Sequence, residues 1–229
     1  MKNIPSILGA FLGTLTLLTL TACSPAAPES PTAGTAKGNP APTPATPDSE
    51  AQQAALLKGK EITAEVGKSL SSVLLAAIQE GGPTNAIPLC SVQAVPLTSN
   101  LANKHGVSIR RVSHRARNLA NRASESEIQI IRKYQDQKDA GSPLQPMIQP
   151  GANGSLTFYA PIAIATNLCL NCHGVPGDTL VTGIAEAVAK LYAEDQATGF
   201  QLGDLRGLWR VDFPSTFIAK LSPQEPANP

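Results

Sequence analysis

The sequence predicts an α+β fold in which helices come first and an antiparallel sheet with further helices follows. Apolar residues recur at helical spacing across residues 49–80. Further along, short apolar runs at 107–112, 156–165 and 208–213 have the composition of strands and are separated by helical patterns and turn signals. Helices that precede a mixture of strands and helices are typical of the α+β class with an antiparallel sheet.

The first 48 residues are predicted to lie outside the folded domain. An apolar run of 14 residues, Ile7–Leu20, is too short to span a bilayer and ends in Leu-Thr-Ala before Cys23, which resembles a bacterial lipobox. We therefore predict that residues 1–22 are a lipoprotein signal peptide and that Cys23 is lipidated, with an ordinary cleaved signal as the alternative. Residues 23–48 hold seven of the chain's 20 prolines and are predicted to form a disordered Pro/Ala-rich tether.

A lipidated N-terminus anchors a soluble domain to a membrane without threading it through. The sequence thus predicts a protein on the periplasmic face, held by lipid. Ser24 after Cys23 favours the outer membrane, by analogy with enteric bacteria.

Two long helices are expected at the start of the domain. The first, over residues 49–80, begins at a capping box formed by Ser49 and ends at Gly81-Gly82. The second, over about 85–104, carries Cys90, and a proline within it predicts a bend.

The rest of the domain, predicted to extend over residues 49–218 with a polar tail at 219–229, follows from turn and capping signals. Its elements are expected in this order: a strand at 107–112, a helix from the capping box of Ser124 and Glu127 to about Gly141, a proline-rich loop, a turn at Asn153-Gly154, a strand at 156–165, a short helix at 182–193 and a strand at 208–213.

The sequence Cys169-Leu170-Asn171-Cys172-His173 carries the strongest functional signal. C-x-x-C-H is the signature of covalent c-type haem attachment, in which each cysteine forms a thioether with a vinyl group and the histidine binds the iron. A zinc site would need two further ligands at suitable spacing, and a thioredoxin-like pair would need a βαβ setting. We therefore predict one covalent haem c bound by Cys169, Cys172 and His173.

The second axial ligand is open from the residues alone. Cys90 remains unpaired once the other cysteines are assigned to lipid and haem, and a thiolate is a good metal ligand, but a buried cysteine is often only an apolar side chain. His114 is an alternative ligand. Met147 is expected to pack or lie at the surface, and His105 is expected to cap a helix end.

Five arginines crowd a span that has no acidic residue. The span is either a solvated loop or a source of haem-propionate ligands, with Arg110 and Arg117 as the candidates. The net charge of +1 and the aromatic content of 4% give no indication of nucleic-acid binding. The arginines are Arg110, Arg111, Arg115, Arg117 and Arg122.

Five ordered motifs together resemble a bacterial family of c-type haem domains first catalogued as having unknown function, over about residues 50–215. They are Ala86-Ile87-Pro88-Leu89-Cys90; Ile109–Ser113; Arg117–Asn121; Tyr159-Ala160-Pro161 ahead of Cys169–Gly174; and Asp195–Phe200 leading to Gly203–Gly207.

The resemblance implies a PAS-like fold, with an antiparallel sheet flanked by helices and one covalent haem. It also implies that His173 and Cys90 are the axial ligands. His114 stands where this family is expected to have an apolar residue, which keeps His114 as an alternative or switched ligand. Members of the family occur as sensor modules of membrane signalling proteins and as stand-alone secreted or anchored proteins.

Two functions are consistent with these features. One is redox sensing, or the sensing or binding of a diatomic gas such as CO or NO, with a signalling protein as partner. The other is electron transfer by a tethered single-haem cytochrome with a redox partner. No nucleophile–base arrangement is recognisable, so an enzyme is not predicted, and the prolines and strand-like runs between 107 and 213 disfavour a four-helix cytochrome.

Overall fold

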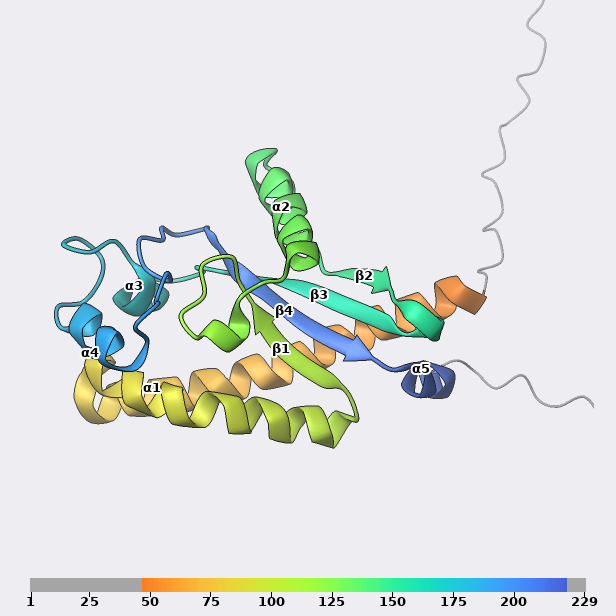
Figure 1. The fold of residues 1–229 in the computed structure, drawn as a ribbon, viewed down its shortest axis with the longest axis horizontal. Helices are drawn as coiled ribbons and strands as arrows, with labels where there is room; N and C mark the ends of the chain where they lie inside the picture. The colour runs from red at the N-terminus through yellow and green to blue at the C-terminus, as the bar shows by residue number, and fades with distance from the viewer. Residues whose placement is uncertain (1–46, 222–229) are drawn as a thin grey trace, which may run out of the picture. The chain divides into compact units, whose positions relative to one another are not determined.

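The computed structural model describes residues 47–221 (Figure 1). The predicted signal peptide, Cys23 and all but the last two residues of the predicted tether lie outside the described residues, as does the chain from 222 onward. The predictions for those segments therefore stay predictions.

The described residues form an α+β fold, as predicted. The strands of residues 47–221 make one antiparallel sheet in the order β1-β4-β3-β2, with helices on both of its faces (Figure 1). In chain order the elements are α1 (Pro47–His105), β1 (Ser108–Val112), the 3-10 turn η1 (Leu119–Asn121), α2 (Glu125–Asp139), β2 (Met147–Pro150), the 3-10 turn η2 (Ala152–Gly154), β3 (Leu156–Ala163), α3 (Asn167–His173), α4 (Ile184–Leu191), β4 (Leu205–Phe213) and α5 (Ser215–Leu221).

Helix α1 is broken at the position predicted. Gly81 and Gly82 have non-helical backbone angles, and Gly82 takes φ 77° and ψ 177°, a conformation that residues with a Cβ rarely adopt. The chain reverses there, so the two halves of α1 lie side by side (Figure 1), and Glu65 of the first half pairs with His105 at the end of the second. The helix begins at Pro47, ahead of the predicted cap Ser49, because proline is favoured in a first turn.

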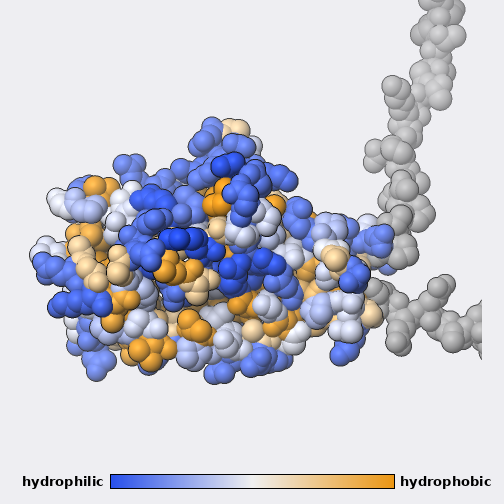
Figure 2. All heavy atoms as spheres, viewed as in Figure 1, coloured by the Kyte–Doolittle hydropathy of each residue, from blue (hydrophilic) through white to orange (hydrophobic). Residues whose placement is uncertain are grey.

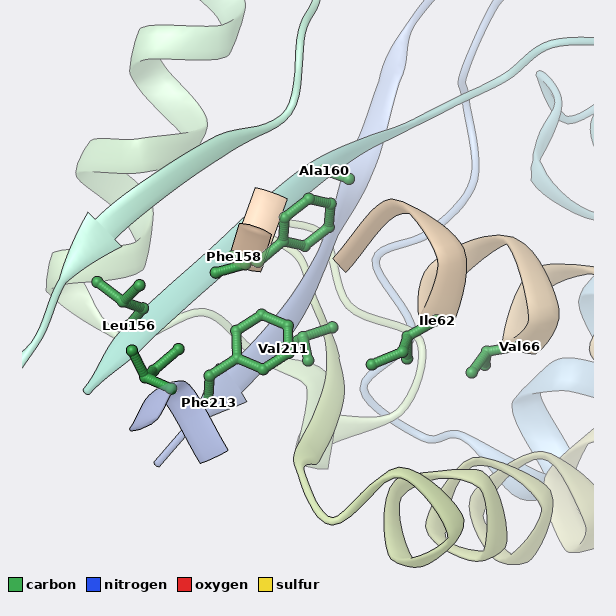
Figure 3. Packing of buried hydrophobic residues seen from close by; sticks show 9 residues of the cluster. Ile62, Val66, Leu156, Phe158, Ala160, Val211 and Phe213 are labelled. Atoms are coloured by element: carbon green, nitrogen blue, oxygen red, sulfur yellow. The ribbon is translucent and has the colours of Figure 1, made fainter. Parts of the chain in front are cut away.

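The first half of α1 packs on one face of the sheet. Successive side chains of a strand point to opposite faces of a sheet, so every second residue of β3 and β4 points to this face. They include Phe158 of β3 and Val211 and Phe213 of β4. Ile62 and Val66 of α1 meet these side chains, and all five are completely buried (Figure 3). We name this side of the sheet the α1 face.

Helix α2 packs on the opposite face, named here the α2 face. Its buried residues Ile131 and Tyr134 contact Leu208 of β4, and the Tyr134 hydroxyl donates to the carbonyl of Tyr159 at 3.1 Å. The predicted capping box at the start of α2 is present, with Ser124 as the cap.

Glu127 of that capping box is fully buried yet charged. Its carboxylate accepts from Arg110 of β1 and from Arg210 of β4, and it also receives the backbone N–H and hydroxyl of Ser124. Burial alone would raise the pKa of Glu127, but these hydrogen bonds outweigh it and hold the pKa below its usual range. Glu127 thus ties α2 to two strands.

Two elements differ from the sequence-based expectation. Residues 147–150 were expected in a proline-rich loop but form β2, because β3 supplies a hydrogen-bonding partner that propensity does not record. Residues 215–221 were expected to lead into a polar tail but form α5, because Phe217 and Ile218 pack against Phe213.

Most of the face seen in Figure 2 is hydrophilic, with apolar side chains scattered among the polar ones. Among residues 47–221, the exposed large apolar side chains include Val92, Val95, Leu119 and Leu168. Within the same range no helix is long and apolar enough to cross a membrane.

Candidate cofactor-binding cavity

A cavity of about 320 Å³ lies between the sheet, the two halves of α1 and α3. Its volume falls within the range of roughly 300–1,000 Å³ that is typical of small-molecule sites. The cavity brings together five predicted site residues from distant parts of the chain: Cys90, Arg117, Cys169, Cys172 and His173.

The α1 wall of the cavity is mostly apolar. Leu74 and Ile78 come from the first half of the helix, while Ile87, Cys90 and Ala94 come from the second. The spacing of the last three is 3 and 4 residues, which places them on one helix face. The break at Gly81-Gly82 is therefore what brings Cys90 to the cavity.

Another wall of the cavity is the short helix α3. Cys169 and Cys172 are three residues apart, so their side chains share one side of this helix, and His173 follows directly. The helix ends at Gly174, whose backbone N–H donates to the Leu170 carbonyl at 2.8 Å. A Cβ at position 174 would lie 2.6 Å from that carbonyl oxygen, so the sharp turn after the motif requires glycine.

Residues 195–200 clamp the end of α3. The backbone N–H of Phe200 donates to the His173 carbonyl at 2.9 Å, and that of Gly199 donates to the Gly174 carbonyl at 2.7 Å. Arg117 completes the clamp by donating to the Cys172 carbonyl at 2.7 Å while it pairs with Asp195 at 3.0 Å. Residues 195–200, which were singled out in the sequence by the family resemblance, thus fix the orientation of the C-x-x-C-H motif.

His173 is held as a neutral ring with one free nitrogen. Its Nδ1 lies 2.7 Å from the carbonyl oxygen of Ala197, and since a carbonyl only accepts, Nδ1 carries the proton. Burial, and secondarily the charges of Arg206 and Arg117, lower the pKa of His173 to about 3. The neutral imidazole keeps a lone pair on Nε2, and a carbonyl that fixes the tautomer is the usual companion of a metal-binding histidine.

The three cysteines of the described range are free thiols, not a disulfide. Burial raises the pKa of the Cys90 thiol, and the charges of Arg111 and Arg117 act in the opposite direction. Burial likewise raises the pKa of Cys172. Within residues 47–221 no group of three or more His, Cys, Asp or Glu side chains is arranged to hold a metal ion unaided.

The arginines divide between the two faces of the sheet. Arg117 lines the cavity, but Arg110 does not: it lies on the α2 face, bound to Glu127. The expectation that Arg110 binds the cofactor is therefore corrected, and the reason is strand geometry, since neighbouring residues of a strand point to opposite faces. Arg111 points to the cavity instead, and Arg206 of β4 joins it there.

The other candidate ligands do not line this cavity. His114 is absent from its lining, although its Nδ1 is buried without a hydrogen-bond partner in the described range, and burial lowers the pKa of His114. His105 is bound to Glu65 at the end of α1. Met147 lies in β2, where its sulfur accepts from Gln149.

Comparison with known proteins gives two matches. A family model described as Tll0287-like matches residues 45–214. The crystal structure of the cyanobacterial haem protein Tll0287 is similar to this chain with a TM-score of 0.50 and 21% sequence identity, covering 66% of this chain and 92% of that one. At that identity the likeness shows the fold alone. No curated protein sequence matches the chain.

Proposed function

This chain belongs to the Tll0287-like family, and from that premise we propose that it is an extracytoplasmic c-type haem protein. One haem is attached through Cys169 and Cys172, and His173 and Cys90 are its axial ligands. The proposal is supported by the C-x-x-C-H sequence and by the similar cyanobacterial protein, which is a haem protein.

The observation that carries the proposal is the meeting of Cys90 with His173 at one cavity. His173 has its Nδ1 bound to Ala197 and its Nε2 free, as an iron ligand requires. Cys90 comes from a different element, and the cavity that both residues line has mainly apolar walls, which suit a flat porphyrin. The residues present therefore fit a haem with two protein ligands.

Bound haem supplies an iron that changes oxidation state and binds diatomic molecules. The protein contributes the ligands and their positions. His173 and the attachment cysteines share α3, whereas Cys90 lies on α1, so the chain can release the Cys90 ligand without losing the cofactor. An anionic thiolate favours ferric iron, and reduction weakens its hold. We therefore propose redox or diatomic-gas sensing, with CO and NO as candidate gases, read by a signalling partner.

Electron transfer by a tethered cytochrome is the second candidate, and one observation favours it. Val95 and Leu168 line the cavity and are also 51% and 37% exposed. A group bound there would have an edge near the surface that a redox partner could approach. Reduction of such a carrier should leave its axial ligands unchanged.

The membrane anchor belongs to the same proposal. Cys23 as the lipidated residue would hold the haem domain at the periplasmic face, in the outer membrane, on the tether up to residue 48. Mass spectrometry of the protein from membranes should find lipid on Cys23, and Cys23→Ser should abolish it. An N-terminus cleaved elsewhere without lipid would contradict the anchor while leaving the haem proposal intact.

The deciding experiment compares ferric and ferrous absorption and EPR spectra of the wild type and Cys90→Ala, both matured where haem attachment occurs. Ser91→Ala is the matched control, since Ser91 also lines the cavity beside Cys90. We expect low-spin thiolate character in the wild type and in Ser91→Ala, and its loss in Cys90→Ala. A ligand that changes on reduction would favour sensing, and an unchanged one electron transfer.

Identical spectra for the wild type and Cys90→Ala would contradict the assignment of Cys90. His114→Ala would then identify or eliminate the remaining alternative. A protein that acquires no covalent haem at all would contradict the proposed function as a whole.

A further inference from the structure

Two arginines face the cavity with no carboxylate to balance them. Arg111, Arg117 and Arg206 all line it, whereas no aspartate or glutamate of residues 47–221 does. Arg117 is neutralised by Asp195, at 3.0 Å. Neither Arg111 nor Arg206 forms an ion pair in the described part of the chain, and Asp195, whose charge also acts on Arg206, is already paired with Arg117.

Arg111 reaches the cavity from β1. Its side chain makes no hydrogen bond or ion pair with any residue of the range 47–221. Burial lowers the pKa of Arg111, and the groups that act against this shift are Cys90 and Tyr192, which are uncharged as free side chains near neutral pH. The guanidinium of Arg111 thus lines a partly buried cavity while its five donors make no hydrogen bond to the described residues.

Arg206 reaches the cavity through an irregularity in the sheet. Ile162 of β3 pairs with Gly207 and Ala163 pairs with Leu205, so Arg206 is the extra residue of a bulge. Bulges redirect a side chain and are frequent beside functional sites. The guanidinium of Arg206 bonds only neutral oxygens among the described residues: its Nη1 lies 2.9 Å from the Ser113 hydroxyl and 3.0 Å from the Arg115 carbonyl.

The Nε and Nη2 donors of Arg206 make no hydrogen bond within residues 47–221. Its Nε is buried and has no hydrogen-bond partner in the described range. Burial, and next the charge of Arg117, lower the pKa of Arg206 to about 10, so the group is charged at neutral pH. A buried charge without a counter-charge is costly, which means that the folded chain gains free energy when a ligand provides an anion.

We infer that Arg111 and Arg206 form the anion site of this cavity and bind the two propionate carboxylates of the haem. The inference rests on the proposed function, and it assigns the propionates to two arginines other than the pair expected from the sequence. The two cavity arginines without an ion pair in the described range match in number the two carboxylates of the ligand. Planar guanidinium groups suit carboxylates because they can donate two parallel hydrogen bonds.

The same chemistry could bind a free anion such as phosphate, so the test must separate the two sources. The full chain, reduced and without haem, is titrated with haem and with haem dimethyl ester, which has the same ring but no carboxylate charge. Binding is followed by the Soret band. The titrations are repeated for Arg111→Gln and Arg206→Gln, and in the presence of inorganic phosphate.

We expect the wild type to bind haem more tightly than the diester, and each variant to bind haem about 10-fold to 100-fold more weakly, with diester affinity unchanged. The control is Arg122→Gln, because the Arg122 side chain is exposed and, among residues 47–221, forms an ion pair only with Glu194 at the surface. It should leave both affinities unchanged. Arg111→Lys and Arg206→Lys keep the charge and should retain part of the preference for haem if a Gln variant fails to fold.

Equal binding of haem and diester by the wild type would overturn the inference. So would an equal loss of affinity for both ligands in the variants, which would mean a structural role. If phosphate binds the cavity while the wild type does not distinguish haem from diester, the occupant is a small anion and the propionate assignment is wrong. Failure of the wild type to bind any haem would instead contradict the proposed function.

Discussion

Arginines on the two faces of the sheet differ in whether they have a carboxylate partner. On the α2 face, Arg110 and Arg210 meet the buried carboxylate of Glu127. On the α1 face, Arg111 and Arg206 meet no carboxylate among the described residues. Because Arg110 and Arg111 are adjacent in β1, the difference comes from strand parity and not from any difference in sequence neighbourhood.

This difference in partners indicates that the arginines of the α2 face stabilise the fold and that those of the cavity bind a ligand. A buried ion pair that the chain completes itself fixes one element against another, and breaking it leaves an uncompensated charge. A partly buried charge that forms no ion pair does not stabilise the chain without haem, and it is available to a ligand. The α2 face is thus expected to control the stability of the chain without haem, and the cavity to control its response to the cofactor.

The largest effect should come from breaking the ionic tie on the α2 face. Glu127→Gln should lower the free energy of unfolding by about 3 kcal/mol, since two arginines lose their counter-charge in a buried position. Urea unfolding near neutral pH, followed by circular dichroism, measures it. Glu125→Gln in the same first turn is exposed and should change stability by less than about 0.5 kcal/mol. Equal losses of stability in Glu127→Gln and Glu125→Gln would contradict the stabilising role assigned to the buried ion pairs of Glu127.

Acidic pH should lower the stability of the chain by protonating Glu127 on the α2 face. The pKa of Glu127 is lowered in the folded chain, so its stabilising contribution is full above the ordinary glutamate value of about 4.3 and is lost as pH falls towards the folded-state value. The stability difference between wild type and Glu127→Gln should therefore shrink below about pH 4.3. Unfolding curves recorded between neutral and acidic pH test this, and a constant difference would contradict it.

A smaller loss of stability is expected from a substitution at the break in α1, which brings Cys90 to the cavity. Gly82→Ala should cost about 1–2 kcal/mol, because alanine is strained at φ 77°. Gly67→Ala provides a control of opposite sign: Gly67 lies inside the helix with nothing within 4 Å of the added Cβ, so it should stabilise by about 0.5–1 kcal/mol. Thermal unfolding of both variants measures the pair, and a shift of the same sign in both would contradict the assigned strain.

The smallest loss of stability is expected from Arg111→Gln in the chain without haem: it should lower the free energy of unfolding by less than about 0.5 kcal/mol, because Arg111 has no ion-pair partner to lose within residues 47–221. Its neighbour supplies the comparison: Arg110→Gln removes a partner of Glu127 and should cost about 1–3 kcal/mol. Denaturant unfolding of the two variants side by side is the measurement. If Arg111→Gln destabilises as much as Arg110→Gln, Arg111 has a structural role that its lack of partners does not suggest.

Local signals in the sequence predicted much of the fold. The break at Gly81-Gly82 and the capping box of Ser124 and Glu127 depend on backbone angles and on hydrogen bonds within four residues, which sequence records directly. β2 was missed because a short strand depends on its partner, and α5 because its helix is stabilised by packing on Phe213.

The cavity was predictable only in part. The C-x-x-C-H motif and Cys90 could be named from the sequence, and strand parity could have separated Arg111 from Arg110, since the strand at 107–112 was already predicted. Arg206 could not have been found in that way, because its position depends on a bulge between β3 and β4. The clamp of residues 195–200 on α3 depends on contacts between distant segments, which periodicity does not encode.

The residues of the cavity differ in how much of the chain must fold before they come together. Cys169 and Cys172 are three residues apart, so covalent attachment, as proposed, needs only a short peptide. The meeting of Cys90 with His173 requires a loop of some eighty residues to close, which is slow and entropically costly. A haem can therefore be attached to a chain that has not folded. The red colour of a preparation would then report attachment, and only the spectrum of the Cys90 ligand would report folding.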